Sequence, residues 1–333
     1  MSRGDVSRLY ADAFAEFANR SGALPASDAV AATPGFVQRV DGQDFGRRVQ
    51  QAVDASGDAD LGVRFGAAIG GRGFGLLGIA TATAPSLQQS LASLVRWEPL
   101  TSTLGRIGIR RSRRHLRLTW TPHVAVPPAA IEGILGGWVA FGRFLVGENV
   151  PVVALELAHA RRARSEADAV LGCEVRFGAA CNAVVIPLDI LDARPRYADV
   201  QLHAALAQWL DDCVQVLGGG DAAVFDAGRL ILDRLALGET SEDLVAEGLG
   251  LARRTFQRRL AQNGLSFRRL RDLLRASVAV CRLSGGSERL LDVAQHVGFA
   301  EQATFTRAVR QWTARTPREV ARLFAADYAA LRR

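Results

Sequence analysis

Arginine and glutamine side chains recur on two stretches of the chain that repeat one another. The two copies cover residues 245–258 and residues 293–307, and Gly250 of the first copy is equivalent to Gly298 of the second. Each copy has a short apolar-patterned helix, a glycine turn, and a second helix that carries arginine or polar residues. This order is typical of a helix-turn-helix, in which glycine lets the chain reverse in little space. Two such motifs on one basic chain indicate a protein that binds duplex DNA.

Guanidinium and carboxamide groups are well suited to reading the edges of DNA bases. Arginine pairs bidentately with guanine and glutamine with adenine in the major groove, which is wide enough to admit an α-helix. We therefore predict recognition helices over residues 253–263 and 301–312. The opposite faces of these helices carry large apolar side chains that we predict to be core residues and not intercalating wedges: Phe256, Leu260, Phe305 and Trp312.

A single helix over residues 267–283 is predicted to connect the two motifs. At 1.5 Å per residue it spans about 25 Å, which allows two recognition helices to enter successive major grooves roughly 34 Å apart. Four arginines share one face of this helix: Arg268, Arg271, Arg275 and Arg282. We expect Arg268 and Arg271 to reach the DNA backbone and Arg275 to be a structural ion-pair partner.

Positive charge is concentrated toward the C-terminal end of the sequence. Residues 222–333 carry 19 arginines against 12 acidic residues, whereas residues 1–221 carry 22 of each, so the net charge of +7 lies in the last third. A neutral domain followed by a basic one predicts that only the second binds a polyanion. The 333 residues and the 49% hydrophobic content are consistent with about two folded domains.

We predict an effector-sensing and dimerisation domain (residues 1–217), a short glycine linker (218–221) and a DNA-binding domain (222–333). The first is predicted to be α+β with a small, mostly antiparallel sheet. The second is predicted to be all-α, with two tandem helix-turn-helix motifs joined by a linker helix. Apolar spacing predicts helices in the first domain over residues 7–19, 45–55, 85–97, 129–146 and 201–216. Alternation predicts a hairpin over residues 106–111 and 115–121, with further strands at 152–159 and 183–187 and one beginning within 74–80.

No common catalytic motif is found in the sequence. The chain has no Walker loop, no GxGxxG after a strand, no HExxH and no GxSxG, and its four cysteines form no CxxC. We therefore predict no catalytic residues, no metal and no cofactor, and hence a protein that is not an enzyme. An N-terminus without an apolar signal region, and a longest apolar run (residues 133–142) too short to span a bilayer, predict a cytoplasmic protein without a membrane segment.

The C-terminal residues 222–322 resemble the DNA-binding domain of the AraC family of bacterial transcription regulators. The signature of that family's second motif is matched by Gly298-Phe299, Phe305-Thr306-Arg307 and Thr316-Pro317, and its connecting helix by Arg275, Ala279 and Leu283. The N-terminal part is similar to a branch of the family that has an α/β effector domain in place of a cupin barrel. The matching segments there are residues 61–66, 75–78 and 173–178.

This resemblance implies a sequence-specific transcription regulator that binds double-stranded operator DNA, forms a homodimer, contacts RNA polymerase and responds to an unidentified small molecule. The family's base-reading positions correspond to Arg254, Gln257 and Arg258 in the first motif and to Gln302, Thr306 and Arg307 in the second. The expected phosphate contacts are Arg253, Arg259, Arg268, Arg271 and Arg310. Ala252 and Ala300 stand where the family usually has a Ser or Thr helix cap, Val309 replaces a usual Phe, and Ala314 a usual Gly.

Two features of the N-terminal part leave alternatives open. Four aromatic residues are either core residues or the lining of an effector pocket: Trp97, Trp120, Trp138 and Phe141. Four arginines at the hairpin tip form either a solvated turn, a site for an acidic effector or a contact on flanking DNA: Arg110, Arg111, Arg113 and Arg114.

Other functions remain as alternatives to an effector-controlled regulator. They are an enzyme-like N-terminal domain tethered to DNA, a constitutive DNA-binding protein without an effector, and a sequence-blind architectural binder. The unequal recognition helices disfavour the last, because phosphate contacts alone suffice for blind binding.

Overall fold

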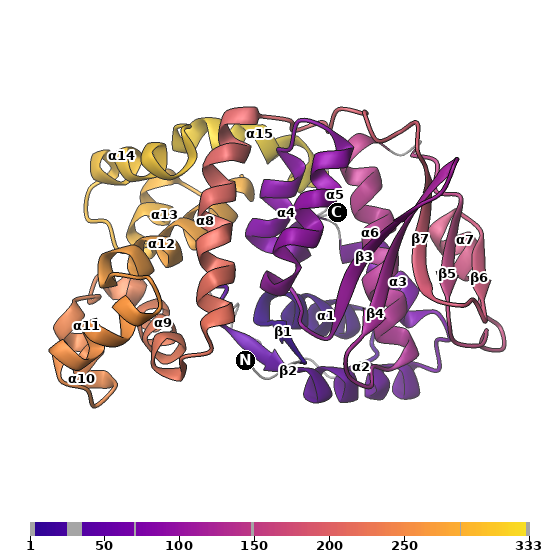
Figure 1. The fold of residues 1–333 in the computed structure, drawn as a ribbon, viewed down its shortest axis with the longest axis horizontal. Helices are drawn as coiled ribbons and strands as arrows, with labels where there is room; N and C mark the ends of the chain where they lie inside the picture. The colour runs from indigo at the N-terminus through magenta and orange to yellow at the C-terminus, as the bar shows by residue number, and fades with distance from the viewer. Residues whose placement is uncertain (1–3, 25–34, 70, 148–149, 287, 331–333) are drawn as a thin grey trace. The chain divides into compact units, whose positions relative to one another are not determined.

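The computed structural model describes residues 4–24, 35–69, 71–147, 150–286 and 288–330. These residues form two compact units (Figure 1). One unit contains residues 4–24 and 39–198 and holds both β-sheets; the other contains residues 35–38 and 199–330, and its regular elements in the described part are helices. The predicted layout of a mixed N-terminal part followed by a helical C-terminal part is confirmed.

A five-stranded sheet forms one layer of the N-terminal unit, in the order β3-β4-β7-β5-β6. Its strands are β3 (Gly105–Arg111), β4 (His115–Pro122), β5 (Ala154–Leu157), β6 (Val175–Phe177) and β7 (Asn182–Pro187). The sheet is mostly antiparallel, as predicted, since only β5 and β6 run parallel. The hairpin pairs Ile107 with Trp120, and both side chains are buried. A separate two-stranded ribbon joins β1 (Asp5–Ser7) to β2 (Arg39–Asp41).

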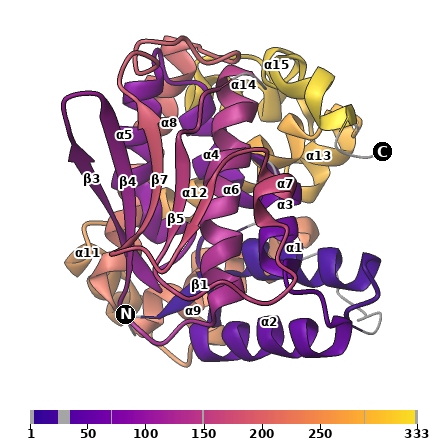
Figure 2. The ribbon, with the colours of Figure 1, turned by 90° about the vertical axis from the view of Figure 1, so that its right-hand side faces the viewer.

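Helices pack around the larger sheet, and α6 runs along one of its faces (Figure 2). The helices of this unit are α1 (Arg8–Arg20), α2 (Gly42–Ser56), α3 (Leu61–Ile69), α4 (Gly75–Ala82), α5 (Leu87–Trp97), α6 (Pro128–Val146) and α7 (Ala167–Leu171). Side-chain oxygens of Ser7, Asp41 and Ser86 accept hydrogen bonds from the first free amides of α1, α2 and α5. Local capping therefore fixes where these helices begin.

Helix α6 is the core helix of the N-terminal unit. A Cβ added at Gly66 of α3 would lie 2.7 Å from the carbonyl oxygen of Gly133, and one at Gly62 would overlap the backbone of Ala129, so glycine lets α3 and α6 touch backbone to backbone. By length and composition α6 is the one helix of the described residues that could cross a membrane, but 67% of that apolar window is buried inside the fold. Its hydrophobicity is accounted for by packing.

The strand predicted to begin within residues 74–80 is wrong, because this segment is helix α4. All its residues from Leu77 to Ala82 are buried. A helix buried on nearly all sides lacks the polar face that gives a sequence its helical period, and a short apolar run then resembles a buried strand.

The C-terminal unit contains two short helix pairs with a long helix between them. Its helices are α8 (Val200–Gly219), α9 (Ala222–Arg234), α10 (Glu242–Gly248), α11 (Arg253–Gln262), α12 (Phe267–Ser284), α13 (Leu290–His296), α14 (Gln302–Thr313) and α15 (Pro317–Ala330). The pair α10 and α11 precedes α12, and the pair α13 and α14 follows it. These bounds agree within one or two residues with the recognition and connecting helices predicted above.

Helix α8 belongs to the C-terminal unit, so the division between the compact units falls at residues 198 and 199 and does not coincide with the predicted linker at 218–221. The helix continues through Gly218 and Gly219; Gly220 then takes a φ of 65°, and Asp221 caps α9. The Trp209 ring of α8 meets Trp312 of α14 edge to face, with 6.3 Å between ring centroids. The apolar stripe of α8 was visible in the sequence, but a stripe does not specify which domain covers it.

Candidate nucleic-acid interface

Helix α11 presents a polar face that carries all three base-reading candidates of the first motif. Arg254, Gln257 and Arg258 are exposed, and no acidic residue lies on this helix. Phe256 and Leu260 on the opposite face are buried, with 0% and 1% of their surface exposed, as predicted for core residues. In the described part of the chain no ion pair or side-chain hydrogen bond engages the three polar residues, so their donors are available to a ligand.

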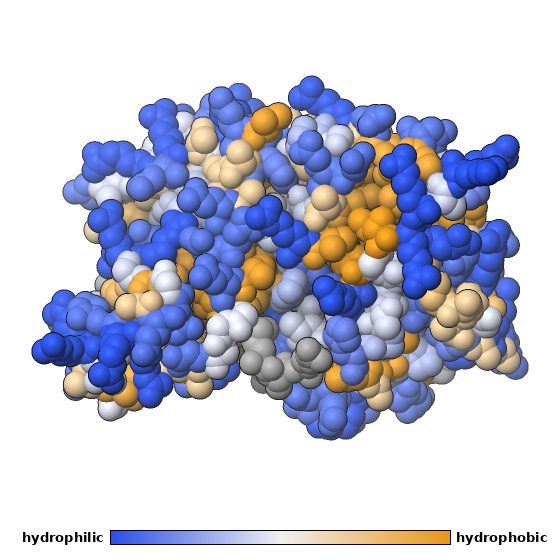
Figure 3. All heavy atoms as spheres, viewed as in Figure 1, coloured by the Kyte–Doolittle hydropathy of each residue, from blue (hydrophilic) through white to orange (hydrophobic). Residues whose placement is uncertain are grey.

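The two arginines predicted to clamp phosphate from α11 are paired with carboxylates of neighbouring helices. Arg253 lies 2.9 Å from Glu242 and 3.2 Å from Asp243, and Arg259 lies 3.6 Å from Asp221. Exposed pairs of this kind contribute at most about 1 kcal/mol each. Exchanging a carboxylate for a phosphate therefore costs little. Hydrophilic side chains dominate the surface of the α10–α11 end of the unit (Figure 3).

Helix α14 carries the candidates of the second motif with fewer free donors. Gln302, Arg307 and Arg310 are exposed, and Thr306 is half-buried. The Thr306 hydroxyl donates to the Gln302 carbonyl at 2.8 Å, and Arg307 donates to the Thr304 hydroxyl at 3.1 Å. The predicted core residues Phe305 and Trp312 are buried, with 0% and 3% exposed.

Both turns contain glycine, as the repeat predicts, and both glycines adopt the left-handed region. Gly250 has a φ of 64° and Gly298 a φ of 76°. The surroundings differ, because a Cβ at Gly298 would lie 2.8 Å from the carbonyl oxygen of Leu235, whereas one at Gly250 would meet nothing within 4 Å. The second turn is thus packed closely against Leu235 and Arg275, whereas the first is open.

The arginines of α12 divide into exposed and structural ones. The Arg268 side chain is 81% exposed and lies 3.8 Å from Asp272, whereas that of Arg271 is 29% exposed and lies 3.9 Å from the same carboxylate. Arg275 donates to the Gly298 carbonyl at 3.2 Å and lies 4.8 Å from the centroid of the Phe299 ring. Burial lowers the pKa of Arg275 to about 10. Arg275 is structural, but a carbonyl and a ring take the place of the expected carboxylate.

The helix caps differ from the prediction in the second motif. Ala252 is the N-cap of α11 and offers no side-chain acceptor, as predicted. The N-cap of α14 is Glu301 and not Ala300, and it too makes no capping hydrogen bond. Ser241 and Ser266 do cap α10 and α12. The two helices predicted to be recognition helices, α11 and α14, therefore begin with amides that have no side-chain cap, unlike α10 and α12.

No group of three or more His, Cys, Asp or Glu side chains that could hold a metal ion occurs within the described ranges. The four cysteines are free thiols.

Comparisons with known protein families account for both units. The model of the N-terminal arabinose-binding domain of AraC transcription regulators matches residues 29–195, half of the chain, and a helix-turn-helix domain model matches residues 245–323. The chain belongs to the AraC family of transcription regulators.

Relatives of this AraC-family regulator are bacterial regulators matched over most of their length. An uncharacterised HTH-type transcriptional regulator of Mycobacterium tuberculosis is 28% identical over 276 residues, 80% of this chain and 79% of the relative. The ornithine utilization regulator of Pseudomonas aeruginosa is 23% identical over 282 residues, 82% of each chain. The crystal structure of the transcriptional regulator CdpR from P. aeruginosa matches with a TM-score of 0.37 and 23% identity, over 75% of this chain and 82% of that one.

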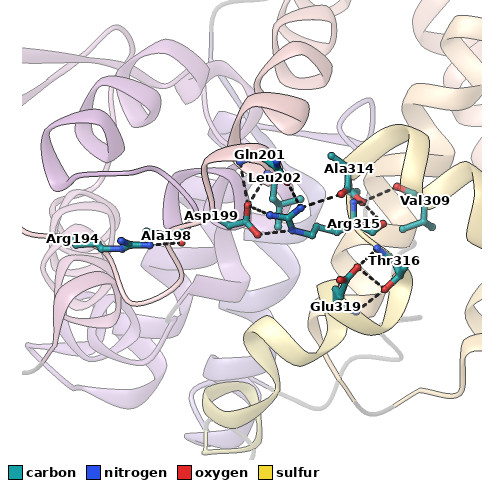
Figure 4. Close-up of polar contacts among 11 residues, drawn as sticks. Arg194, Ala198, Asp199, Gln201, Leu202, Val309, Ala314, Arg315, Thr316 and Glu319 are labelled. Atoms are coloured by element: carbon teal, nitrogen blue, oxygen red, sulfur yellow. Dashed lines mark hydrogen bonds and ion pairs between the residues drawn. The ribbon is translucent and has the colours of Figure 1, made fainter.

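The Thr-Pro signature of this AraC-family regulator begins α15 (Figure 4). The Thr316 amide donates to the Glu319 carboxylate at 2.7 Å, and the Glu319 amide donates to the Thr316 hydroxyl at 3.2 Å. Pro317 occupies the first helical position, where a missing amide costs nothing. The signature is therefore a capping box, which fixes the start of the last helix.

An ion pair joins the end of α14 to the start of α8 within the helical unit of this regulator, and sequence reasoning missed it. Arg315 donates twice to Asp199, at 2.8 Å each, and Asp199 also accepts from the Gln201 and Leu202 amides as the N-cap of α8 (Figure 4). Burial raises the pKa of Asp199, but these hydrogen bonds outweigh burial and hold it below its ordinary value. The only signal in the sequence was an Asp at a helix start, which says nothing of a distant arginine.

A second contact holds α8 against α12. The Arg269 guanidinium stacks 3.8 Å from the centroid of the Trp209 ring, and its Nε donates to Asp212 at 2.7 Å. Trp209 thus contacts both Arg269 and Trp312, so α8 packs on both α12 and α14.

Proposed function

We propose that this regulator binds specific operator sequences through both helix pairs, each acting as a helix-turn-helix, and that a small molecule bound by the N-terminal unit modulates this binding. The observation that carries the proposal is the exposed, acid-free face of α11, where Arg254, Gln257 and Arg258 stand on a helix anchored by Phe256 and Leu260. Donors fixed on a packed helix match the geometry of major-groove base edges.

The second motif, on α14, makes fewer contacts with base edges than the first motif, on α11. We assign Gln302, Thr306 and Arg307 to base edges, but two of these side chains are already bonded within α14. Glu301 at the start of the helix adds a carboxylate that repels phosphate. We assign backbone phosphate to the remaining arginines: Arg253, Arg259, Arg268, Arg271 and Arg310.

Effector sensing and DNA binding are assigned to different units, and the boundary between them lies at the start of α8 instead of at residues 218–221. The N-terminal unit would sense the effector and dimerise, and the helical unit beginning at Asp199 would bind DNA. This boundary is supported by the contacts of Asp199, Trp209 and Asp212 with Arg315, Trp312 and Arg269. A homodimer, a contact with RNA polymerase and a cytoplasmic location complete the proposal, and the relatives named as regulators favour it over a tethered enzyme.

The test compares Arg254→Ala with the wild-type chain on two kinds of DNA. A cognate site is selected with the wild-type protein from random duplexes, and affinities for it and for random DNA are measured at one salt concentration. We expect a loss of about 1–3 kcal/mol on the cognate site and little change on random DNA. Arg47→Ala is the matched control, because this exposed arginine lies in the N-terminal unit and pairs with Asp44. Equal losses on both DNAs would remove Arg254 from the base-reading set.

A further inference from the structure

A cavity of about 30 Å³ lies inside the N-terminal unit, among α1, α4, α5, α6 and the hairpin β3–β4. Two of the four aromatic residues considered for a pocket, Trp120 and Trp138, line it, whereas Trp97 and Phe141 are core residues outside the lining. Phe74 and Leu77 add apolar wall. Hydrophobic side chains also gather on the surface over α5 and β3 (Figure 3).

The cavity has one charged lining residue, Glu98. Its Oε2 accepts a hydrogen bond from the Ile107 amide at 2.8 Å, and the Trp120 indole donates a second bond to the carboxyl group. These two donors fix the carboxyl group in the cavity wall. Burial raises its pKa to about 7 against the lowering effects of these bonds and of Arg106, so the carboxylate is poorly solvated.

The chemistry of the wall selects among ligand classes. A carboxylate accepts at about four lone-pair sites, so capacity remains beside the two bonds that Glu98 already has. Aromatic ring faces attract cations, and Trp120 and Trp138 both contribute to the lining. An anionic ligand would be repelled by the carboxylate. A sugar would need several polar partners, whereas the walls away from residues 98–102 are almost entirely apolar.

We propose that this cavity binds a small organic cation, an apolar alkylamine whose ammonium group contacts the Glu98 carboxylate and whose carbon chain lies against Trp120 and Trp138. The inference deepens the proposed function, since it rests on that proposal for the regulatory role and names the chemical class of the effector. The binding itself requires no DNA. The cavity volume limits the first probe to a few heavy atoms unless the lining side chains move.

The test uses the full chain and three probes that share one isobutyl group and differ in the polar group it carries: isobutylamine, isobutanol and isovalerate. Binding is followed by the thermal unfolding midpoint and by tryptophan fluorescence, because a ligand that prefers the folded state must stabilise it. We expect isobutylamine to raise the midpoint and to change the fluorescence, with isobutanol much weaker and isovalerate inactive. Equal responses to the amine and the alcohol, or no response to the amine, would overturn the proposal.

Two variants locate the amine. Glu98→Gln keeps an acceptor for the Ile107 amide but removes the charge, and we expect it to weaken isobutylamine binding by about 10- to 100-fold while isobutanol binding is unchanged. Ile134→Trp fills the cavity and leaves Glu98 in place, and it should abolish binding even if Glu98→Gln folds poorly. Asp54→Asn, on the exposed side of α2, is the control for nonspecific amine effects. Unaltered amine binding in both cavity variants would contradict the assignment.

A DNA titration separates this inference from the proposed function. Affinity for the selected operator is measured with and without saturating isobutylamine. Binding of the amine through Glu98 without a change in DNA affinity would support the cavity assignment and contradict the effector role. A change in DNA affinity that persists in both cavity variants would overturn the cavity assignment and leave the regulated DNA binding standing.

Discussion

Gly250 and Gly298 occupy equivalent turns, and their surroundings make them a matched pair for measurement. Alanine in the left-handed region costs about 1–2 kcal/mol, so both substitutions by alanine should destabilise the chain. Gly298→Ala should cost at least about 1 kcal/mol more, since its Cβ would press on the Leu235 carbonyl and on Arg275 and a crowded core resists added volume.

Urea unfolding of the full chain, followed by circular dichroism, gives the two free energies of unfolding under identical conditions. Similar losses for Gly250→Ala and Gly298→Ala would show that the second turn relaxes freely. At this scale the repeat in the sequence was enough to predict two glycine turns at equivalent positions. The carbonyl of Leu235 comes from outside the repeat, and for that reason the difference between the turns was not predictable.

At the scale of elements, the proposed recognition helices α11 and α14 begin without the side-chain caps that α10 and α12 possess. The backbone of Ala252 is extended, with φ −63° and ψ 139°, which is the conformation of a capping residue. We therefore expect Ala252→Ser to stabilise the free protein by about 1 kcal/mol. DNA affinity should hold or rise, because a capped helix needs less ordering on binding.

The control for this prediction is Ala300→Ser, one residue before the N-cap of α14. A hydroxyl there is outside the capping position, so the unfolding midpoint in urea should not change. A gain as large as that of Ala252→Ser would place the start of α14 at Ala300 after all. The one-residue error arose because the second copy has one more residue than the first between its turn glycine and the Phe of its recognition helix, and repeat alignment alone does not say where a helix begins.

At the scale of the whole molecule, the assignment of α8 to the helical unit changes how the net charge is divided between the two units. The helical unit from residue 199 carries 19 arginines against 16 acidic residues, a net of +3, and the other unit carries 22 against 18, a net of +4. Dividing the chain at residue 221 placed the whole net charge of +7 in the C-terminal part, and this asymmetry disappears when the chain is divided at residue 199. The remaining asymmetry is local. Asp199, Asp212 and Asp221 pair with Arg315, Arg269 and Arg259, and none of them pairs with the three arginine and glutamine side chains proposed to read bases from α11.

The sequence was sufficient for the amphipathic helices predicted above, for the hairpin and for the family, because each depends on local spacing or on a short motif. It was not sufficient for the buried helix α4, which has no polar face. The membership of α8 in the helical unit depends on Trp209 meeting Trp312 and Arg269 across more than fifty residues of chain. A single amphipathic stripe fits either domain equally well. Long-range pairing of this kind is therefore the part of the fold that residue patterns did not specify.

The same packing predicts that the DNA-binding unit needs α8 to be stable. A fragment of residues 199–333 keeps the Trp209–Trp312 contact and the two arginine–aspartate pairs, whereas a fragment of residues 222–333 exposes Trp312 and leaves Arg269 and Arg315 without these partners. Losing a buried tryptophan contact costs about 3 kcal/mol or more, so the shorter fragment should have a clearly lower midpoint in urea.

The control is Arg315→Ala in the longer fragment, which removes one ion pair and keeps α8. We expect it to lower the free energy of unfolding by about 1–3 kcal/mol, because Asp199 remains half-buried without its partner. Both fragments should bind the selected operator where they are folded, with affinity that falls steeply with salt. Equal midpoints for the two fragments would mean that α8 contributes nothing to the DNA-binding unit and would restore the boundary at residues 218–221.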